Sequence, residues 1–329
     1  MTEPRSRVAV IVGGPGCEAN VSRTSGAAVA EALVERGFEC QCIELGQDTV
    51  RELQAQGAEV AFPVSHGPVG EDGCLQGLLE VLDLPYVGSA VLASALAAHK
   101  PAAKRLFKIA ELPLAPDALV TDSADLAQQA EGLRARLGAE LVVKPASGGS
   151  AIATTRVTAT DPLTTLVAAL SEALAVDEAA LVEALIPGEE VTCGVLERDA
   201  EARALPPTLI ESRAASWYDF ESRYAAGGSV HRCPAPFPPG LSERIQSVAL
   251  AAHRTLGCRD LSRADFIVDP DTDTVTLLEV NTLPGMTSTS LYPEAAAADG
   301  IAFGELCELL VRRALSRGRR MQRQALAMP

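Results

Sequence analysis

The chain has 329 residues, which is enough for a substantial hydrophobic core divided among two or three domains. It carries 43 Asp and Glu against 28 Lys and Arg, a net charge of −15, which excludes a general nucleic-acid or anionic-membrane binder because such proteins need a basic surface. The eight cysteines form no CxxC pair, and neither a signal peptide nor a bilayer-spanning apolar run is recognisable, so we expect a cytoplasmic protein with reduced thiols.

The first part of the chain predicts a parallel sheet. Strands are expected over 7–13, 39–45 and 59–64, and helices over 21–36 and 50–56. This alternation implies right-handed crossovers, and ligands bind at the loops that follow the carboxyl ends of such strands. Two glycine-rich loops, 13–22 and 65–73, lie at those ends.

The second of these loops, SHGPVGEDG (65–73), would present His66 to the ligand crevice. A single His is more often structural, but its place after a parallel strand modestly favours a functional role. Glu71 and Asp72 are better explained as caps of the helix that begins near Gly73.

A second block begins near Leu114, after helices expected over 89–98 and 101–110. Within it we expect helices over 124–137 and 162–175, a hairpin over 141–157, and strands over 180–186 and 190–197. The hairpin contains KPASGGS (144–150), where Lys144 ends a strand and the glycines would let backbone N–H groups approach phosphate oxygens. An ordinary glycine-rich turn is an equally good interpretation, because the loop is not a P-loop.

The third block contains YDFESRYAAGG (218–228), which mixes aromatic and charged residues and ends in glycines. It suits a lid that closes over a reaction and excludes water, although a surface loop with core-anchoring aromatics would have the same composition. A helix is expected over 303–315. We interpret the arginine-rich tail 311–329 as a frayed helix end rather than a partner-binding site.

Two acidic strands carry the most informative pattern. Glu279 and Asn281 are two residues apart in LEVNTLPGMT (278–287), so their side chains point the same way from an extended segment. Asp265 lies in a neighbouring apolar run. Three hard oxygen ligands suit Mg²⁺, which takes its other ligands from water and substrate phosphates, and they favour an ATP site over a solvated acidic strand edge.

Four blocks occur in the order typical of one family: HGPVGEDGCLQGLLE (66–80), PYVGSAVLASALA (85–97), YDFESRY (218–224) and EVNTLPGMTSTSLYP (279–293). The chain therefore resembles the D-alanine–D-alanine ligases of the ATP-grasp superfamily over nearly its whole length. The resemblance implies an α/β (α+β ATP-grasp) fold with three domains: an N-terminal doubly wound parallel-sheet domain that binds substrate (1–98), a central ATP-grasp domain (99–188) and a C-terminal ATP-grasp domain with the metal site (189–329). It implies ATP-dependent ligation of two D-alanines through an acyl phosphate, for peptidoglycan synthesis.

The resemblance also implies an ATP site and a metal site. The ATP site would consist of Lys100 and Lys144 at the phosphates, Glu183, Ala184, Leu185 and Ile186 along the adenine, Glu190 at the ribose, and Arg223 from the lid. Two magnesium ions, with Mn²⁺ as an alternative ion, would be held by Asp265, Glu279 and Asn281, and Glu279 would bridge them.

The remaining implied roles concern the two amino-acid substrates. Glu18 would receive the ammonium of the first one, and Ser150 and Tyr224 would be linked to Glu18 by hydrogen bonds. Arg263 and the Gly285 N–H would stabilise the oxyanion of the second step. The other substrate-binding residues would be His66, Ser290 and Leu291, with Ser290 at the second carboxylate.

The chain departs from the family pattern at a few positions. Ala19-Asn20 follows Glu18 where a basic residue and an acid are frequent, Ala151 replaces a serine, Ala153 replaces a glycine, His99 replaces an acid, and Arg223 replaces a lysine. The metal ligands and the implied catalytic residues remain, so we expect the chemistry to be intact. The departures instead bear on the geometry of the phosphate loop, the rate and the choice of substrate.

Other functions stay open. One is a related ligase with a different amino-acid or hydroxy-acid acceptor, in secondary metabolism or antibiotic resistance. Another is a non-catalytic nucleotide-binding protein, which the retained acidic triad and Arg263 argue against. A dinucleotide dehydrogenase is disfavoured because no GxGxxG follows the first strand. As partners we expect D-alanine, ATP and a second copy of the chain in a homodimer, with no nucleic acid and no membrane.

Overall fold

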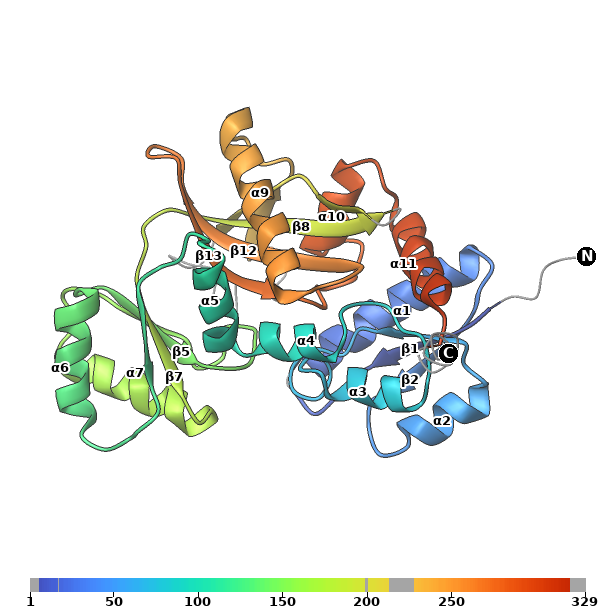
Figure 1. Ribbon diagram of the computed structural model, residues 1–329, viewed down its shortest axis with the longest axis horizontal. Coiled ribbons are helices and arrows are strands. Elements are labelled where there is room, and N and C mark those ends of the chain that lie inside the picture. Colours follow the sequence, from blue (N-terminus) through green and yellow to red (C-terminus); the bar gives the residue numbers. More distant parts are fainter. Residues whose placement is uncertain (1–5, 17, 199–200, 213–227, 320–329) are drawn as a thin grey trace, which may run out of the picture.

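The chain folds into three parts that lie side by side, as the computed structural model in Figure 1 shows. The structure describes residues 6–16, 18–198, 201–212 and 228–319. The N-terminal part lies at the right of Figure 1, the central part at the lower left, and the C-terminal part above them. No helix within these described ranges combines the length and the apolar character that crossing a membrane requires.

The N-terminal part is built on a three-stranded parallel sheet in the order β2–β1–β3. Its elements are β1 (Arg7–Val12), α1 (Ala19–Glu35), β2 (Glu39–Glu44), α2 (Thr49–Gln56), β3 (Val60–Pro63) and α3 (Cys74–Val81). Alternate residues of β1 face opposite sides: Val8 and Val10 pack with α1, whereas Ala9 and Ile11 pack with apolar residues of α2 and α3. The expected parallel sheet with helices on both faces is confirmed.

The helix α11 (Phe303–Arg317), the last one in the described residues, packs against this N-terminal part. Leu306 and Leu310 of α11 share a hydrophobic cluster with Val29 and Leu33 of α1. The two ends of the chain thus contribute to one core, although they are distant in the sequence. The domain boundaries expected at 98/99 and 188/189 stay a prediction.

A buried charge cluster joins the N-terminal part to the C-terminal part. Asp260, which is 0% exposed, accepts hydrogen bonds from the Gly88 N–H at 2.8 Å and from the Arg317 guanidinium at 2.7 Å. Arg317 also donates to the Tyr86 carbonyl at 2.7 Å. A carboxylate tolerates such burial because it is paired and hydrogen-bonded. The cluster fixes the loops of the parallel sheet relative to the strands that carry the acidic residues.

The central part is a four-stranded antiparallel sheet in the order β4–β7–β5–β6. Its elements are β4 (Asp117–Val120), α6 (Leu126–Leu137), β5 (Leu141–Pro145), β6 (Thr155–Val157), α7 (Leu163–Val176) and β7 (Ala180–Ala184). The apolar faces of α6 and α7 bury one face of this sheet. β5 and β6 form the predicted hairpin, and the loop between them is the expected phosphate loop.

The C-terminal part is a six-stranded antiparallel sheet in the order β11–β10–β8–β12–β13, with β9 paired to β8. Its strands are β8 (Glu189–Arg198), β9 (Glu201–Ala204), β10 (Thr208–Ser212), β11 (Ser229–Arg232), β12 (Leu261–Asp269) and β13 (Thr274–Asn281). One face is covered by α4 (Val91–Ala98), α5 (Lys100–Ile109) and α9 (Pro239–Leu256), and α10 (Leu291–Ala298) contacts β8. The parallel sheet followed by antiparallel sheets confirms the expected α/β class.

The long helix α9 is not predicted by the sequence pattern. It begins at Pro239, within PAPFPPG (234–240), and a proline-rich run of this kind is typical of a loop. The structure shows that prolines are accommodated at the beginning of α9, where the missing backbone N–H would have no partner within the helix.

Candidate active site

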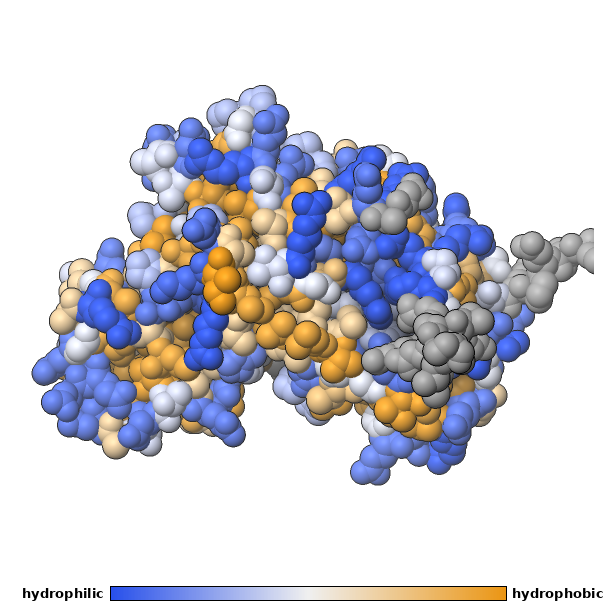
Figure 2. Space-filling model, viewed as in Figure 1, coloured by the Kyte–Doolittle hydropathy of each residue, from blue (hydrophilic) through white to orange (hydrophobic). Residues whose placement is uncertain are grey.

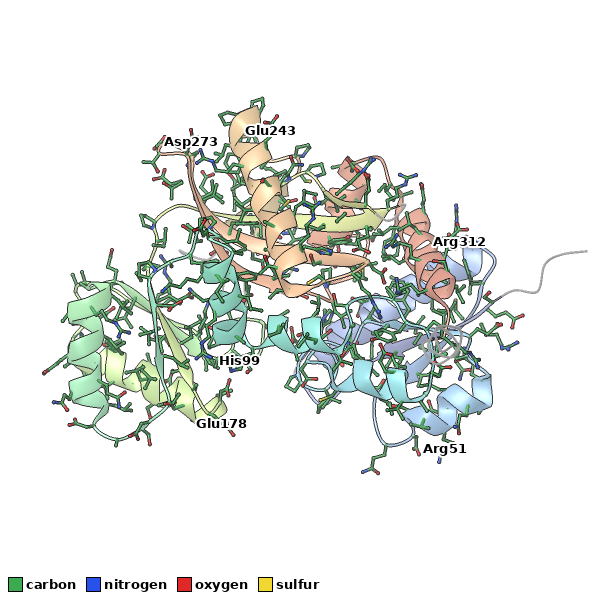
Figure 3. The ribbon with its side chains drawn as sticks, in the orientation of Figure 1. Arg51, His99, Glu178, Glu243, Asp273 and Arg312 are labelled. Atoms are coloured by element: carbon green, nitrogen blue, oxygen red, sulfur yellow. The ribbon has the colours of Figure 1, made fainter. Side chains whose placement is uncertain are left out.

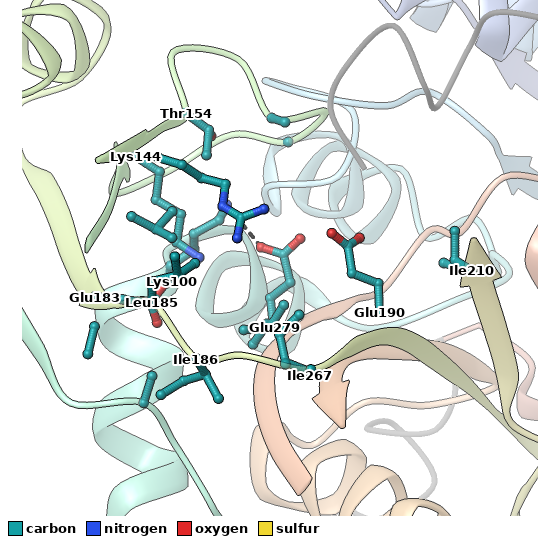
Figure 4. A pocket seen from close by; sticks show the side chains of 18 of the residues that line it. Lys100, Lys144, Thr154, Glu183, Leu185, Ile186, Glu190, Ile210, Ile267 and Glu279 are labelled. Atoms are coloured by element: carbon teal, nitrogen blue, oxygen red, sulfur yellow. Dashed lines mark ion pairs between the residues drawn. The ribbon is translucent and has the colours of Figure 1, made fainter. Parts of the chain in front are cut away.

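A cavity of about 410 Å³ lies between the central sheet and the C-terminal sheet, and Figure 4 looks into it. Its volume falls within the range of small-molecule sites. The apolar lining comes from both sheets and includes Val142, Leu185, Ile186, Leu209, Ile267 and Leu278. The charged lining consists of Lys100, Lys144, Arg156, Glu183, Glu189, Glu190, Glu211 and Glu279. All of the residues expected to contact ATP from the described ranges therefore line one cavity.

Lys144 ends β5 and is held by a buried carboxylate. Its Nζ lies 2.6 Å from Glu183 Oε2, and Glu183 is only 3% exposed. Burial alone would raise the pKa of Glu183, but the ammonium groups of Lys144 and Lys104 lower it below its ordinary value. Glu183 is therefore an anion in the wall of the cavity that orients Lys144.

Lys100 opens α5 and connects the cavity to the acidic strands. Its Nζ lies 3.4 Å from Glu279 Oε2 and also donates to the Gly148 carbonyl in the loop that follows Lys144. The preceding His99 accepts a hydrogen bond from the Ala102 N–H through Nδ1 at 3.2 Å, and it stands at the start of α5 in Figure 3. His99 thus caps the helix, which is a role that an acid at this position would also perform.

The loop between β5 and β6 adopts an unusual backbone. Three non-glycine residues have positive φ angles: 52° at Ser150, 55° at Ala151 and 50° at Ala153. L-residues pay a steric cost in this region, and Ala153 stands where the family pattern has a glycine. The loop thus keeps this left-handed backbone conformation at Ala153, although an alanine adopts it at a higher steric cost than a glycine would.

We predict that Ala153→Gly stabilises the protein. The change should raise the free energy of unfolding by about 0.5–1 kcal/mol, because relief of the left-handed strain exceeds the entropy that glycine adds to the unfolded chain. Urea denaturation of the full chain measures this change. The matched control is Ala139→Gly in another exposed loop without positive φ, which should be destabilising. Equal destabilisation by both changes would contradict the assignment of strain to Ala153.

The acidic residues share one face of the C-terminal sheet. β12 and β13 are antiparallel, and their register places Asp265 opposite Glu279 and Arg263 opposite Asn281. Directly opposed residues point to the same face, so all four side chains stand together. Ala264 and Val280, which alternate with them, are buried against the helices on the other face. The structure therefore brings Asp265, Glu279 and Asn281 together on one face of the sheet.

These residues fit a magnesium site that draws part of its coordination from phosphate. Arg263 holds Asp265 with two hydrogen bonds, of 2.7 and 2.8 Å, and Thr192 adds a third at 2.9 Å. A carboxylate offers about four lone-pair sites, so it can accept these bonds and still bind an ion. Within the described ranges no group of three or more His, Cys, Asp or Glu is arranged to hold a metal. The two carboxylates and one amide here suit Mg²⁺, which keeps several water or phosphate ligands.

Glu18 lies where the N-terminal part meets the phosphate loop. It immediately precedes α1, and its Oε1 accepts a hydrogen bond from the Ser150 hydroxyl, 132 residues away in the sequence. A Cβ atom built on Gly67 would lie 3.4 Å from Glu18 Oε2, so the loop 65–73 is also close. The structure brings Glu18 and Ser150 together, as expected.

His66 is buried between acidic side chains on the same edge. Its Nδ1 lies 3.9 Å from Glu71 Oε2, and Glu71 Oε1 accepts the Gly67 N–H at 2.8 Å. Burial alone would lower the pKa of His66, but the carboxylates of Glu71 and Glu18 raise it above the ordinary value, against an opposing effect of Arg263. His66 therefore lies in the loop 65–73 where this loop approaches Glu18.

The expectation that Glu71 caps the next helix is wrong. Its carboxylate turns back into the loop towards Gly67 and His66, because the hydrogen bond to the Gly67 N–H closes a tight turn there. Asp72 does have the expected role, since it accepts hydrogen bonds from the Val69 N–H and from the Cys74 N–H at the start of α3.

The segment after β13 leads into the beginning of α10. Ser290 immediately precedes that helix, and its Oγ lies 2.7 Å from Thr287 Oγ1 and accepts the Thr287 N–H at 3.1 Å. A Cβ atom at Gly285 would come within 3.1 Å of Ser290 Oγ, so this turn packs closely. Leu291 is the first helical residue. Gly285, Ser290 and Leu291 therefore lie in one turn at a helix N-terminus, which favours a carboxylate ligand.

The expected lid, 218–228, falls almost wholly outside the described residues. Tyr224 and Arg223 both belong to it, so their expected roles stay predictions.

Two site residues are missed by the sequence interpretation. Lys104, one helical turn after Lys100, contacts Glu183, and Thr192 contacts Asp265. The spacing of the lysines on α5 is a signal for Lys104, because residues four apart share a helix face. Thr192 has no such signal, since it meets Asp265 only through the pairing of β8 with β12.

Comparisons with known proteins identify the family. Residues 106–312 match the family model for the C-terminus of D-ala D-ala ligase, and residues 46–89 match the model for its N-terminus. The D-alanine–D-alanine ligase of Gluconobacter oxydans is 44% identical over 315 residues, which cover 94% of this chain and 100% of that protein.

Solved structures agree with the sequence comparisons. The D-alanine–D-alanine ligase of Bacillus anthracis complexed with ATP has a TM-score of 0.77 and 29% identity, and the match covers 95% of this chain and 98% of that one. The D-Ala:D-Ser ligase of Enterococcus faecalis has a TM-score of 0.81 and 28% identity, with 95% and 100% covered. The fold is thus that of the ATP-grasp ligases, and the chain belongs to the D-alanine–D-alanine ligase family.

Proposed function

We propose that the protein uses ATP to join two D-alanine molecules into D-alanyl-D-alanine for peptidoglycan synthesis. The observation that carries this proposal is the contact of Lys100 with Glu279, at 3.4 Å. It joins the ATP-sized cavity to the acidic face of β12 and β13. Glu18 and Ser150, next to the same phosphate loop, supply a place for an amino-acid substrate beside the phosphates.

The first chemical step would activate a carboxylate. A carboxylate is a poor electrophile, and transfer of the ATP γ-phosphoryl group makes an acyl phosphate with a good leaving group. Charge develops on phosphoryl oxygens during transfer, so catalysis depends on nearby cations. Lys100 and Lys144 would supply them, while Glu18 would hold the ammonium of the first D-alanine through its carboxylate.

The second step would form the peptide bond. The amine of the second D-alanine attacks the carbonyl carbon of the acyl phosphate, and the resulting tetrahedral intermediate carries an oxyanion. Its collapse breaks the bond from carbon to the phosphate oxygen and releases inorganic phosphate, and the nitrogen loses a proton. Arg263 and the Gly285 N–H would stabilise that oxyanion, while His66 would lie beside the first substrate. Ser290 and Leu291, at the beginning of α10, would receive the second carboxylate and its methyl group. The lid residues Tyr224 and Arg223 are proposed to close over the acyl phosphate and exclude water.

Asp265, Glu279 and Asn281 would hold two magnesium ions. The bound ions would neutralise phosphate charge during transfer. The ATP adenine would lie along residues 183–186, and Glu190 would contact the ribose. A cytoplasmic location and a homodimer are further parts of the proposal. Figure 2 shows apolar side chains at the surface along α4, where Leu92 is 70% exposed, and sedimentation of the full chain would test whether two copies associate.

The acceptor is tested by competition. With ATP and D-alanine, we expect D-alanine to be preferred as second substrate over D-serine and D-lactate at mildly acidic to mildly alkaline pH. Leu291 offers an apolar wall that suits a methyl group, and an amine is a stronger nucleophile than a hydroxyl. His231 does not alter this expectation, because its ring nitrogens lie 2.9 Å from Glu294 Oε2 and 3.1 Å from Ser229 Oγ.

Product analysis by mass spectrometry distinguishes the outcomes. A depsipeptide as the main product at neutral pH, or a dipeptide ending in D-serine, would overturn the acceptor and leave the ligase chemistry in place. Incorporation of L-alanine in preference to D-alanine would overturn the substrate as a whole. The proposed reaction would be contradicted if the protein hydrolysed ATP in the absence of amino acids and formed no ligated product when they were present.

A further inference from the structure

Lys104 is a buried cation that the reaction described above does not use. It lies on α5, one turn after Lys100, and its side chain is 4% exposed. Its Nζ contacts Glu183 Oε1, lies 3.0 Å from Asp117 Oδ2 and donates to the Ala115 carbonyl at 3.3 Å. Lys104 is absent from the residues that line the cavity, so it would act through a neighbour.

Glu183 is that neighbour, because its two oxygens hold two different lysines. Oε1 meets Lys104, and Oε2 lies 2.6 Å from the Lys144 ammonium. Lys144 does line the cavity, at the end of β5. Figure 4 shows Lys144 and Glu183 close together at the side of the cavity where Lys100 also lies. The carboxylate therefore couples a cation outside the cavity to a cation inside it.

The charges in this cluster balance only if Lys104 is present. Lys104 and Lys144 provide two positive charges, and Glu183 and Asp117 provide two negative charges. Asp117 is 38% exposed in its side chain and is partly solvated, whereas Glu183 is buried. An anion in a low-dielectric site interacts strongly with any cation that remains near it. Without Lys104, Glu183 would form its ion pair with Lys144 alone, and this pair would be stronger.

We propose that Lys104 is a positioning residue for ATP, which neutralises Glu183 so that the Lys144 ammonium remains available to a phosphate group in the cavity. The inference rests on the proposed ATP-dependent function. A cation that is fully paired with a buried anion gains little from a second anion, because it would first have to give up that pair. Because Lys104 also pairs with Glu183, the free energy needed to move the Lys144 ammonium from Glu183 to a phosphate group is smaller. If the salt bridge were purely structural, loss of Lys104 would instead lower the stability of the fold and would not weaken ATP binding selectively.

The test is ATP binding by calorimetry, with magnesium present, to the full-length protein and four variants. Lys104→Met should weaken ATP binding by at least about tenfold, because the uncompensated charge of Glu183 then opposes the phosphates. The matched control is Lys108→Met, which removes the same charge from the next turn of α5, where the side chain is exposed. That control should stay within about twofold of the unmodified protein.

A double variant distinguishes a positioning role of Lys104 in ATP binding from a purely structural role in folding. In the Glu183→Gln background the anion is already neutralised, so adding Lys104→Met should change ATP affinity by less than about threefold. The fourth variant, Glu183→Gln alone, completes the double-mutant cycle, and its effect should not add to that of Lys104→Met. In steady-state assays Lys104→Met should raise the KM for ATP more than it lowers kcat, and leave the KM values for D-alanine nearly unchanged.

Three results would overturn the inference: unchanged ATP affinity in Lys104→Met, a folded double variant that binds ATP about tenfold more weakly than Glu183→Gln, or equal losses of ATP and D-alanine binding. If Lys104→Met does not fold, the two variants that carry Glu183→Gln decide the question, because Lys144 has lost the charge of Glu183 in both of them. A tenfold weaker ATP affinity in the double variant than in Glu183→Gln would then overturn the inference. A failure of the proposed function is distinguishable, because the unmodified protein would itself not bind ATP.

Discussion

Replacing Glu279 by Gln is expected to lower kcat by about 1,000-fold, which corresponds to a loss of roughly 4 kcal/mol of transition-state stabilisation. The amide has almost the same shape as the carboxylate, so packing on β13 should be retained. It lacks the negative charge that a magnesium ion requires, and it no longer pairs with Lys100 across 3.4 Å. Because Glu279 stands opposite Asp265, the change removes one of two carboxylates from the proposed metal site.

Phosphate release from ATP in the presence of D-alanine measures this effect, and thermal unfolding checks that the fold is intact. The matched control is Glu201→Gln on the exposed strand β9, which removes the same charge from the same sheet and should leave kcat unchanged. Raising the magnesium concentration should recover only part of the loss. Near-normal turnover with an unchanged magnesium dependence would exclude Glu279 from the metal site.

Replacing Glu18 by Gln is expected to raise the KM of the first D-alanine by about 10–100-fold, because a charge-assisted hydrogen bond is worth roughly 1.5–3 kcal/mol. The amide oxygen of Gln can still accept the hydrogen bond from Ser150, so the contact with the phosphate loop should survive. Only the charge that would pair with the substrate ammonium is lost. The effect should therefore fall on substrate affinity, with little change in the KM for ATP.

The dependence of the rate on D-alanine concentration yields two Michaelis constants, one for each substrate position. We expect only the constant of the first position to rise in Glu18→Gln. Glu31→Gln on the exposed face of α1 is the control, since it makes the same substitution on the same helix away from the site. A rise in the second constant alone would assign Glu18 to the acceptor, and no change in either would remove it from the substrate site.

Several local features follow from residue patterns alone. The alternation of side chains along a strand places Glu279 and Asn281 on one face, and the structure confirms it. The alternation of strand and helix patterns predicts the parallel sheet of the N-terminal part. The family can likewise be recognised from four motifs, because each motif keeps chemistry-bearing residues at fixed spacing. Such features depend on short stretches of chain, which the sequence specifies directly.

The register between strands is less accessible to sequence reasoning. Asp265 pairs with Glu279, but the next residue of β12, Phe266, pairs with Leu277, so the register shifts by one residue and Leu278 has no partner in the pairing. Without this shift Asp265 would not lie opposite Glu279. That irregularity lets the adjacent residues Leu278 and Glu279 both line the cavity. Simple alternation would have placed them on opposite faces. A bulge of this kind depends on the packing of both strands, so the pattern of one strand does not reveal it.

The amino-acid sequence by itself determined the fold class and the family, because periodicity and motif spacing are local properties. Its resemblance to that family also indicated residues of the cavity, among them Lys100, Lys144 and Glu190. Only the tertiary structure decided that Glu71 turns towards His66 rather than capping α3, and that Glu183 bridges Lys104 and Lys144. It also brought Glu18 to Ser150 across 132 positions of the chain. These contacts join parts of the chain that are far apart in the sequence. Which charged side chains pair depends on the tertiary packing, because packing sets both the distance between them and their exposure to water.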